Sequence, residues 1–378
     1  MTTESKTRMQ TIVVVDDEPS VAEGVAVGLA REGRRIIVCR DIECARLVIE
    51  NEKVDAIVAD IQFRGEFSFD GLDFVDTLKK LAPDVDIYLM TGAGFGGLEK
   101  EALKRGAAGF FQKPFSVNDL DDVLPSPPEG SREEEKVSVP ELDEIIEESL
   151  IHARFQPIVH LATREHVGLE ALARPVTDSL FRNPELLFRY ASRSERTIEL
   201  ECHCLRNSIR VASSLHAKKR LFLNVHPASL EKSAIIRAIE QGLAETNLEP
   251  SRLVLEITEH GSITSPRSLD QIRSLKALGM EFAIDDIGTA FSHLPYIEQI
   301  EPSWMKISQY FGTGFERDET KGKIVRNIAS LASSFEANFI LEGIETEETA
   351  EAASELGIEY GQGYLFARPA EIDTFEYV

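Results

Sequence analysis

Short apolar strands that each end in polar residues constrain the fold of the C-terminal two-thirds of this 378-residue chain. After the first gap, the polar ends recur at intervals of roughly 20 to 36 residues, near the length of one strand–helix unit. Such units close into a TIM-like (β/α)8 barrel, which brings every strand end to one rim. The polar residues at these ends are Glu170, Arg174, Asn224, Glu256, Glu259, Asp285, Asp286, Lys306, Glu342, Glu345 and Gln362. We therefore expect an α/β barrel whose rim carries an active site.

Carboxylates dominate this rim, and two amides, one lysine and one arginine join them. Gathered carboxylates suit hard divalent cations, and the basic side chains suit a phosphoryl group. The set therefore predicts metal-dependent phosphodiester chemistry. A carboxylate at a strand end can also cap a helix or form a loop ion pair. That interpretation fits Glu259 and Glu345 taken singly, but it does not explain the whole set.

Dispersed motifs identify a family for the second domain. The sequence EALAR begins at Glu170, FQP occupies 155–157, EITE 256–259, DDIGT 285–289, EGIET 342–346 and QGYLF 362–366. From about residue 140 onward the chain resembles the EAL family of cyclic di-GMP phosphodiesterases. The resemblance implies an EAL domain over 141–378 that hydrolyses cyclic di-GMP to linear pGpG, and it implies a homodimer.

The resemblance also implies roles for individual residues. Two Mg²⁺ or Mn²⁺ ions would be held by Glu170, Asn224, Glu256, Asp285, Asp286 and Glu342. Lys306 and Glu342 would be catalytic, Gln156, Arg174 and Gln362 would contact substrate, and Glu259 and Glu345 would order a loop. Adjacent residues of a regular strand face opposite sides. Asp285 and Asp286 can therefore both reach metals only if the strand ends or bulges between them.

Three residues depart from the usual EAL pattern: Ala290 replaces a glycine, His293 a small residue and Ser308 an aspartate. None of them is an expected metal ligand, so they predict a change in turnover or metal affinity rather than in reaction type. His226 follows Asn224 by two residues and shares its strand face. It therefore either approaches the metals or packs beside the following proline.

The N-terminal part alternates buried strands with helical patterns, which predicts a doubly wound parallel sheet. One strand is the continuous apolar run TIVVV at 11–15. Ligands of such sheets bind beyond the carboxyl ends of the strands, where Asp16, Asp17, Asp60, Thr91 and Lys113 fall. Converging carboxylates predict one bound Mg²⁺. Asp60 is then a candidate nucleophile toward a phosphoryl donor.

This constellation resembles the receiver domain of two-component response regulators over about residues 10–124, which implies a receiver domain at 1–124. The resemblance implies phosphorylation of Asp60 by a sensor histidine kinase, Thr91, Phe110 and Lys113 as switch residues, and a cis Lys113–Pro114 bond. The sequence IQFRGEFSFDGLDF after Asp60 is longer than the usual loop. A receiver-like fold that is never phosphorylated is the alternative.

Residues 125–140 separate the two domains. The stretch from 124 to 140 contains four prolines and a charge cluster, a composition that favours an extended, poorly packed linker. Apolar residues at helical spacing in ELDEIIEESL then predict a short helix at the entrance to the barrel.

Charge and composition limit the partners. The net charge of −24 repels nucleic acid and anionic membrane surfaces, and no apolar run approaches a membrane span. We therefore expect a cytoplasmic protein that binds neither. The cysteines, including Cys202 and Cys204 around His203, fit buried small residues better than a soft-metal site.

Two other functions remain open at this point. The EAL domain could bind cyclic di-GMP without cleaving it and signal to a protein partner, as a weakly active or inactive receptor. Alternatively, the barrel could be a scaffold with no affinity for the nucleotide. A thermal shift produced by cyclic di-GMP with Ca²⁺ would exclude the scaffold.

Overall fold

The structure is a computed structural model that describes residues 9–60, 70–92, 98–127, 135–214, 219–258, 265–288 and 294–375. The chain divides into two compact units. The first comprises residues up to 150 together with 175–196, and the second comprises 151–174 and 197 onward. None of the helices in the described ranges combines the length and the apolar character needed to cross a membrane.

A six-stranded parallel sheet in the order β5-β4-β3-β1-β2-β6 forms the centre of the first unit. Its elements are β1 (Gln10–Val15), α1 (Pro19–Leu29), β2 (Arg34–Cys39), α2 (Ile42–Asn51), β3 (Ala56–Asp60), α3 (Asp70–Leu81), β4 (Asp86–Thr91), α4 (Leu98–Lys104), β5 (Gly109–Gln112), α5 (Val117–Asp121), β6 (Glu135–Ser138) and α6 (Leu142–Glu147). The central strands are fully buried because helices cover both faces of the sheet. This confirms the expected doubly wound sheet.

The expected linker contributes a strand of its own. β6 pairs in parallel with β2 and extends the sheet at its edge. Val137 and Val139 are buried there, and this apolar anchor explains why the segment packs although its composition favours an unpacked chain. The predicted short helix follows as α6.

The second unit is a closed barrel with the strand order β10-β11-β12-β13-β14-β7-β8-β9. Its strands are β7 (Ile151–His160), β8 (His166–Pro175), β9 (Arg220–Asn224), β10 (Leu253–Thr258), β11 (Glu281–Ile287), β12 (Trp304–Ile307), β13 (Asn338–Leu341) and β14 (Tyr360–Gly361). The expected TIM-like barrel is confirmed, with one difference: β7 pairs antiparallel with β14. The carboxyl ends of the strands from β8 to β14 still meet at one rim.

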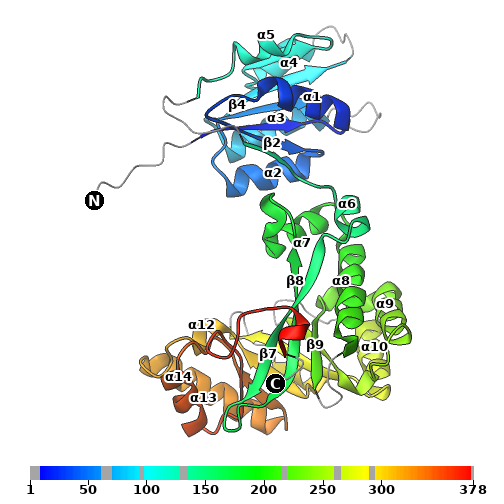
Figure 1. Ribbon diagram of the computed structural model, residues 1–378, viewed down its shortest axis with the longest axis vertical. Coiled ribbons are helices and arrows are strands. Elements are labelled where there is room, and N and C mark those ends of the chain that lie inside the picture. Colours follow the sequence, from blue (N-terminus) through cyan, green and yellow to red (C-terminus); the bar gives the residue numbers. More distant parts are fainter. Residues whose placement is uncertain are drawn as a thin grey trace. The chain divides into compact units, whose positions relative to one another are not determined.

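Helices surround the barrel strands on the outside (Figure 1). They are α8 (Thr197–Val211), α9 (Ser233–Ala244), α10 (Pro266–Ala277), α11 (Leu294–Ile300), α12 (Gln309–Gly312), α13 (Glu319–Ser334) and α14 (Glu347–Glu355). Short 3₁₀ turns join them, among them η3 (Pro227–Glu231). One large apolar core lies between these helices and the strands, and a smaller cluster around Phe222 and Trp304 fills the barrel interior. The core fixes the strands, and thereby the positions of the polar residues at their ends.

Candidate active site

Lys306 lies at the centre of the rim. Its side chain is fully buried on β12, and its Nζ lies 2.9 Å from Glu256 Oε1 and 2.9 Å from Glu342 Oε1. Glu170 Oε2 at 3.2 Å and Asp285 Oδ1 at 3.4 Å complete the ring of carboxylates. The four carboxylates come from β8, β10, β11 and the end of β13, so the closed barrel unites residues that are far apart in sequence.

A bulge in β11 turns two adjacent carboxylates toward the same site. The register with β12 shifts between Ile284 and Ile287, and Asp286 has a left-handed backbone with φ 57°. Its N–H donates to Asp285 Oδ1 at 2.8 Å. Both side chains can reach metals only if the strand ends or bulges between them, and the structure confirms a bulge.

The carboxylates form two groups of three that share Asp285. One group joins it to Glu170 and Glu256, and the other joins it to Asp286 and Glu342. Within each group, one oxygen from each residue lies within 4.8 Å of the others. Two overlapping groups of this kind match the donor set of a two-cation site.

Burial governs the protonation of these groups. It raises the pKa of Glu342 to about 8 and that of Glu256 well above its usual range. Burial also acts on Glu170, but Lys306, Gln362 and Asn224 outweigh it and keep its pKa low. In the absence of cations, part of the cluster is therefore held protonated rather than charged.

Two unsatisfied polar atoms show that the donor set suits a cation and a ligand. Glu256 Oε2 is buried and has no hydrogen-bond partner among the described residues, and the same holds for Gln362 Oε1. A buried acceptor without a donor is costly, and a hard cation satisfies a carboxylate oxygen directly. The residues present therefore fit divalent cations.

The amide side chains form a chain behind Glu170. Asn224 Nδ2 donates to Glu170 Oε1 at 3.0 Å, and Gln362 Nε2 donates to Glu170 Oε2 at 2.7 Å. Gln362 Nε2 also lies 3.2 Å from Gln156 Oε1, and Gln156 in turn donates to the carbonyl of Ala367 at 3.1 Å. The predicted FQP and QGYLF motifs thus meet at the predicted EAL glutamate.

A cavity of about 130 Å³ opens beside this cluster. Its lining includes the predicted residues Gln156, Glu170, Arg174, Glu342, Glu345 and Gln362. It also includes Gln309 and Tyr364, which sequence reasoning did not select. Gln309 lies three residues beyond Lys306, so a wider window at each strand end would have found it. Tyr364 lies inside the QGYLF motif, half-exposed, with the Arg368 guanidinium 4.1 Å from its ring centre.

Close backbone approach fixes the position of Glu342. A Cβ atom added at Gly312 would lie 1.8 Å from the carbonyl oxygen of Glu342, so only glycine lets α12 reach this strand end. Ser308 begins α12, and its hydroxyl accepts from Tyr310 N–H at 3.5 Å. The residue that replaces the usual aspartate therefore caps a helix.

Other predicted residues lie apart from the carboxylates or outside the described ranges. His226 Nδ1 accepts from Ala228 N–H at 3.3 Å and caps η3, which favours its packing interpretation. Glu259, Ala290, His293 and the loop 61–69 lie outside the described residues. The four cysteines are free, and no described cysteine belongs to a cluster of metal-ligating side chains.

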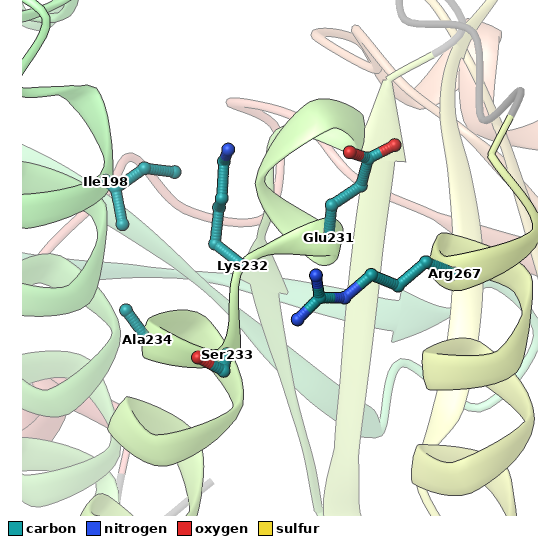
Figure 2. A pocket seen from close by; sticks show the side chains of 6 residues that line it. All are labelled: Ile198, Glu231, Lys232, Ser233, Ala234 and Arg267. Carbon is teal, nitrogen blue, oxygen red and sulfur yellow. The ribbon is translucent and has the colours of Figure 1, made fainter.

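A second cavity, of about 300 Å³, lies between α8, the start of α9 and α10 (Figure 2). It is lined by Ile198, Glu231, Lys232, Ser233, Ala234 and Arg267. These residues carry both signs of charge, and none of them belongs to the carboxylate cluster. We therefore assign the chemistry to the smaller cavity beside Glu170.

The first unit has its own acidic site at the ends of β1 and β3. Lys113 Nζ lies 2.8 Å from Asp16 Oδ2 and 2.7 Å from Asp60 Oδ2. Burial raises the pKa of Asp16. Burial lowers the pKa of Lys113, but the hydrogen bonds to both aspartates outweigh burial, so that the pKa is raised. The structure thus brings the predicted phosphoacceptor together with its predicted lysine.

The remaining receiver residues lie at the same edge or next to it. Thr91 is buried at the end of β4, Asp17 follows β1 and is half-buried, and Phe110 is half-buried in β5. The Lys113–Pro114 bond is cis, as the resemblance implies.

Comparisons with known proteins cover both the receiver and the barrel. RocR of Pseudomonas aeruginosa, named as a cyclic di-GMP phosphodiesterase, is 26% identical over 95% of this chain and 95% of its own length. An uncharacterized signaling protein of Caulobacter vibrioides is 31% identical over 76% of this chain, and the match spans about a third (34%) of that protein.

Solved structures share the barrel. The PaMucR phosphodiesterase in complex with cyclic di-GMP has a TM-score of 0.56 at 26% identity, covering 62% of this chain and 97% of that one. BlrP1 of Klebsiella pneumoniae, solved with manganese and cyclic di-GMP, has a TM-score of 0.53 at 26% identity, covering 58% and 56%. Residues 12–124 match the response regulator receiver domain, and residues 140–369 match the EAL domain. The chain therefore belongs to the EAL domain family and carries a response regulator receiver domain before its EAL domain.

Proposed function

We propose that this protein hydrolyses cyclic di-GMP to linear pGpG and that its receiver domain regulates the reaction. The observation that carries the proposal is the pair of three-carboxylate groups that share Asp285 around Lys306. Relatives named as cyclic di-GMP phosphodiesterases, and solved relatives that hold this nucleotide, support the substrate.

Two divalent cations, Mg²⁺ or Mn²⁺, fit the carboxylates; when bound they neutralise the cluster and acidify a water for attack on phosphorus. Glu170, Asn224, Glu256 and Asp285 would hold one cation, and Asp285, Asp286 and Glu342 would hold the other. The two sites share Asp285, and each keeps two further carboxylates of its own.

The chain's own residues then complete the reaction. Lys306 offsets the negative charge that builds up on the phosphoryl oxygens, and its burial strengthens that effect. Glu342 accepts the proton of the attacking water. Arg174 binds a phosphate oxygen, and its position in the cavity wall beside Glu170 supports that role. Gln156 and Gln362 orient Glu170 and the substrate. Attack forms one P–O bond and breaks another, which opens the cyclic dinucleotide.

In the receiver, a sensor histidine kinase would transfer a phosphoryl group to Asp60. Asp16, Asp17 and Asp60 would hold one Mg²⁺, Lys113 would pair with the new phosphoryl oxygens, and Thr91 and Phe110 would respond to them. A kinase-linked scheme of this kind operates in the cytoplasm. The homodimer implied by the family stays a prediction, which light scattering of the full chain tests.

The deciding test is the hydrolysis of cyclic di-GMP by the full chain with Mg²⁺ or Mn²⁺. We expect pGpG from the wild type and none from Glu170→Ala. Nucleotide binding in the presence of Ca²⁺ without turnover under any condition would contradict the enzyme and support a cyclic di-GMP receptor. The absence of both binding and turnover would leave a scaffold.

A further inference from the structure

The segment that connects β8 to α8 packs with the receiver, although it interrupts the barrel. Residues 175–196, here called the tether, belong to the first compact unit, whereas the residues on both sides of it belong to the second. The tether contains a 3₁₀ turn (Leu180–Arg182) and α7 (Pro184–Arg193). We propose that Tyr190 and Arg193 are positioning residues that fasten the tether to receiver helix α2, and that the tether carries the state of the receiver to Arg174.

Contacts within the first unit hold both ends of the tether. Near its start, Val176 N–H donates to the carbonyl of Leu150 at 2.7 Å. At its end, Arg196 Nη2 lies 2.5 Å from Asp143 Oδ1 on α6. The tether is therefore an ordered part of the receiver unit.

A buried tyrosine joins the middle of the tether to the start of α2. The Tyr190 hydroxyl donates to Asp41 Oδ2, while Asp41 Oδ1 accepts from Cys44 N–H and caps α2. Burial and the Asp41 carboxylate raise the pKa of Tyr190, so its hydroxyl stays protonated and can donate. The ring stacks on Phe181 of the tether at 4.9 Å, which fixes its direction.

An ion pair joins the end of α7 to the end of α2. Arg193 Nη2 contacts both carboxylate oxygens of Glu50, at 3.1 Å and 3.0 Å, and Arg193 Nη1 lies 3.8 Å from Glu43 Oε2. Arg189 adds a longer contact to Glu50 at 3.9 Å. The Tyr190 hydroxyl contacts the start of α2 and the ion pairs with Glu50 lie at its end, so together they fix both the position and the direction of α7.

The same helix is linked to the phosphoacceptor site. Asp16, which shares Lys113 with Asp60, donates its backbone N–H to the carbonyl of Cys39 at 3.2 Å. Cys39 ends β2, two residues before Asp41. One backbone hydrogen bond and one short turn therefore connect the surroundings of Lys113 to Asp41, which accepts the hydrogen bond from Tyr190.

On the other side, the tether begins one peptide bond after Arg174. Because proline follows, the backbone of Arg174 is confined to extended conformations, so a displacement of Pro175 is passed on to Arg174. Glu170 lies four residues earlier on the same strand. These contacts and the chain itself form a continuous route from Lys113 through α2 and the tether to Arg174.

Hydrogen exchange and nucleotide binding on the full chain test this route. The test variant is Tyr190→Phe combined with Arg193→Gln, which keeps the ring stack and the length of both side chains. The matched control is Arg182→Gln, because the contacts described for Arg182, an ion pair with the exposed Asp178 and a hydrogen bond to the carbonyl of Thr177, both stay within the tether. Amide hydrogen exchange of peptides covering 166–174 is measured in the nucleotide-free protein, both without and with beryllofluoride. Protection of residues 56–60 shows that beryllofluoride is bound.

We expect faster exchange at 166–174 in the test variant and wild-type exchange in the control. Beryllofluoride should change exchange at 166–174 in the wild type and leave it unchanged in the test variant. Equal exchange in wild type and test variant, or an equal response of both to beryllofluoride, would overturn the inference.

The catalytic consequence rests on the proposed function. Since the tether sets the position of Arg174 rather than of the carboxylates, the test variant should weaken cyclic di-GMP binding in Ca²⁺ by about fivefold or more, and should raise KM more than it lowers kcat. A fall in kcat with KM unchanged would contradict a role through Arg174. If the wild type binds no nucleotide while the exchange difference persists, the proposed function fails and the tether inference stands.

Discussion

The two halves of this molecule each place one lysine among carboxylates, but at different depths. In the barrel, Lys306 is 0% exposed and lies within 3.4 Å of four carboxylates. In the receiver, the Lys113 side chain is 22% exposed and lies within 2.8 Å of two. The barrel lysine is enclosed by its partners, whereas the receiver lysine reaches them from the edge of the sheet.

This difference suits the roles we propose, chemistry in the barrel and switching in the receiver. A fully buried lysine cannot move away without leaving carboxylates uncompensated, so it provides a fixed charge for a transition state. A partly exposed lysine can exchange one carboxylate partner for a phosphoryl oxygen at lower cost.

Lys306→Met should have the largest effect. Removing a preorganised charge from a buried site lowers kcat by roughly 10²- to 10³-fold, and leaving buried carboxylates unpaired destabilises the metal-free protein by about 3–5 kcal/mol. Mn²⁺ should raise the melting temperature more in this variant than in the wild type, because the cation replaces the missing charge. The surface variant Lys323→Met, which loses a single exposed ion pair, is the control. Wild-type turnover in Lys306→Met would refute the fixed-charge role.

Asp286→Asn should weaken one cation site and spare the other. Asparagine tolerates the left-handed backbone of this position, and the group formed by Glu170, Glu256 and Asp285 keeps all its carboxylates. We expect roughly a 10- to 100-fold loss of turnover. Titration calorimetry should show one tight Mn²⁺ remaining in the barrel. Loss of both sites together would mean that the two groups do not bind independently.

The pH dependence of stability should reveal Glu342. Its pKa is about 8 in the folded protein and about 4.3 when unfolded, so between these values the folded state binds one more proton. The stabilisation is complete below the unfolded pKa and is lost as pH rises through 8. With chelator present, the melting temperature should therefore fall from pH 5 to pH 8, and less steeply in Glu342→Gln. Parallel curves for the two proteins would contradict the assignment.

Lys113→Met should destabilise the protein less than Lys306→Met does, because solvent screens the partly exposed receiver lysine. The variant leaves Asp16 and Asp60 without their shared cation, so Mg²⁺ should restore most of the lost melting temperature. Calorimetry with and without Mg²⁺ measures this. A loss of melting temperature as large as that of Lys306→Met would show that solvent exposure does not distinguish the two lysines.

The strand-end pattern predicted much of the barrel site because a closed barrel leaves few places for such residues. Glu170, Asn224, Glu256, Lys306 and Gln362 meet in the structure, as expected from residues at parallel strand ends. Their chemical roles stay predictions. The doubly wound sheet was equally predictable, since its central strands are continuous apolar runs.

Tertiary contacts decide what the sequence could not predict. No local pattern indicates that α7 packs on α2 through Tyr190 and Asp41, because each helix alone is an ordinary amphipathic segment. The same is true of β6, where two valines outweigh a composition typical of a linker. The left-handed backbone of Asp286 depends on the β11 bulge, which only the pairing with β12 reveals.

The two-cation site is best tested by anomalous diffraction from crystals of the full chain grown with Mn²⁺ and a non-hydrolysable analogue of cyclic di-GMP. We expect two manganese peaks in the barrel, one in each three-carboxylate group, with Asp285 contacting both and Arg174 at a phosphate. A single manganese peak in the barrel would contradict the two-cation site. The absence of any barrel peak, with Lys306 still paired to all four carboxylates, would contradict it as well.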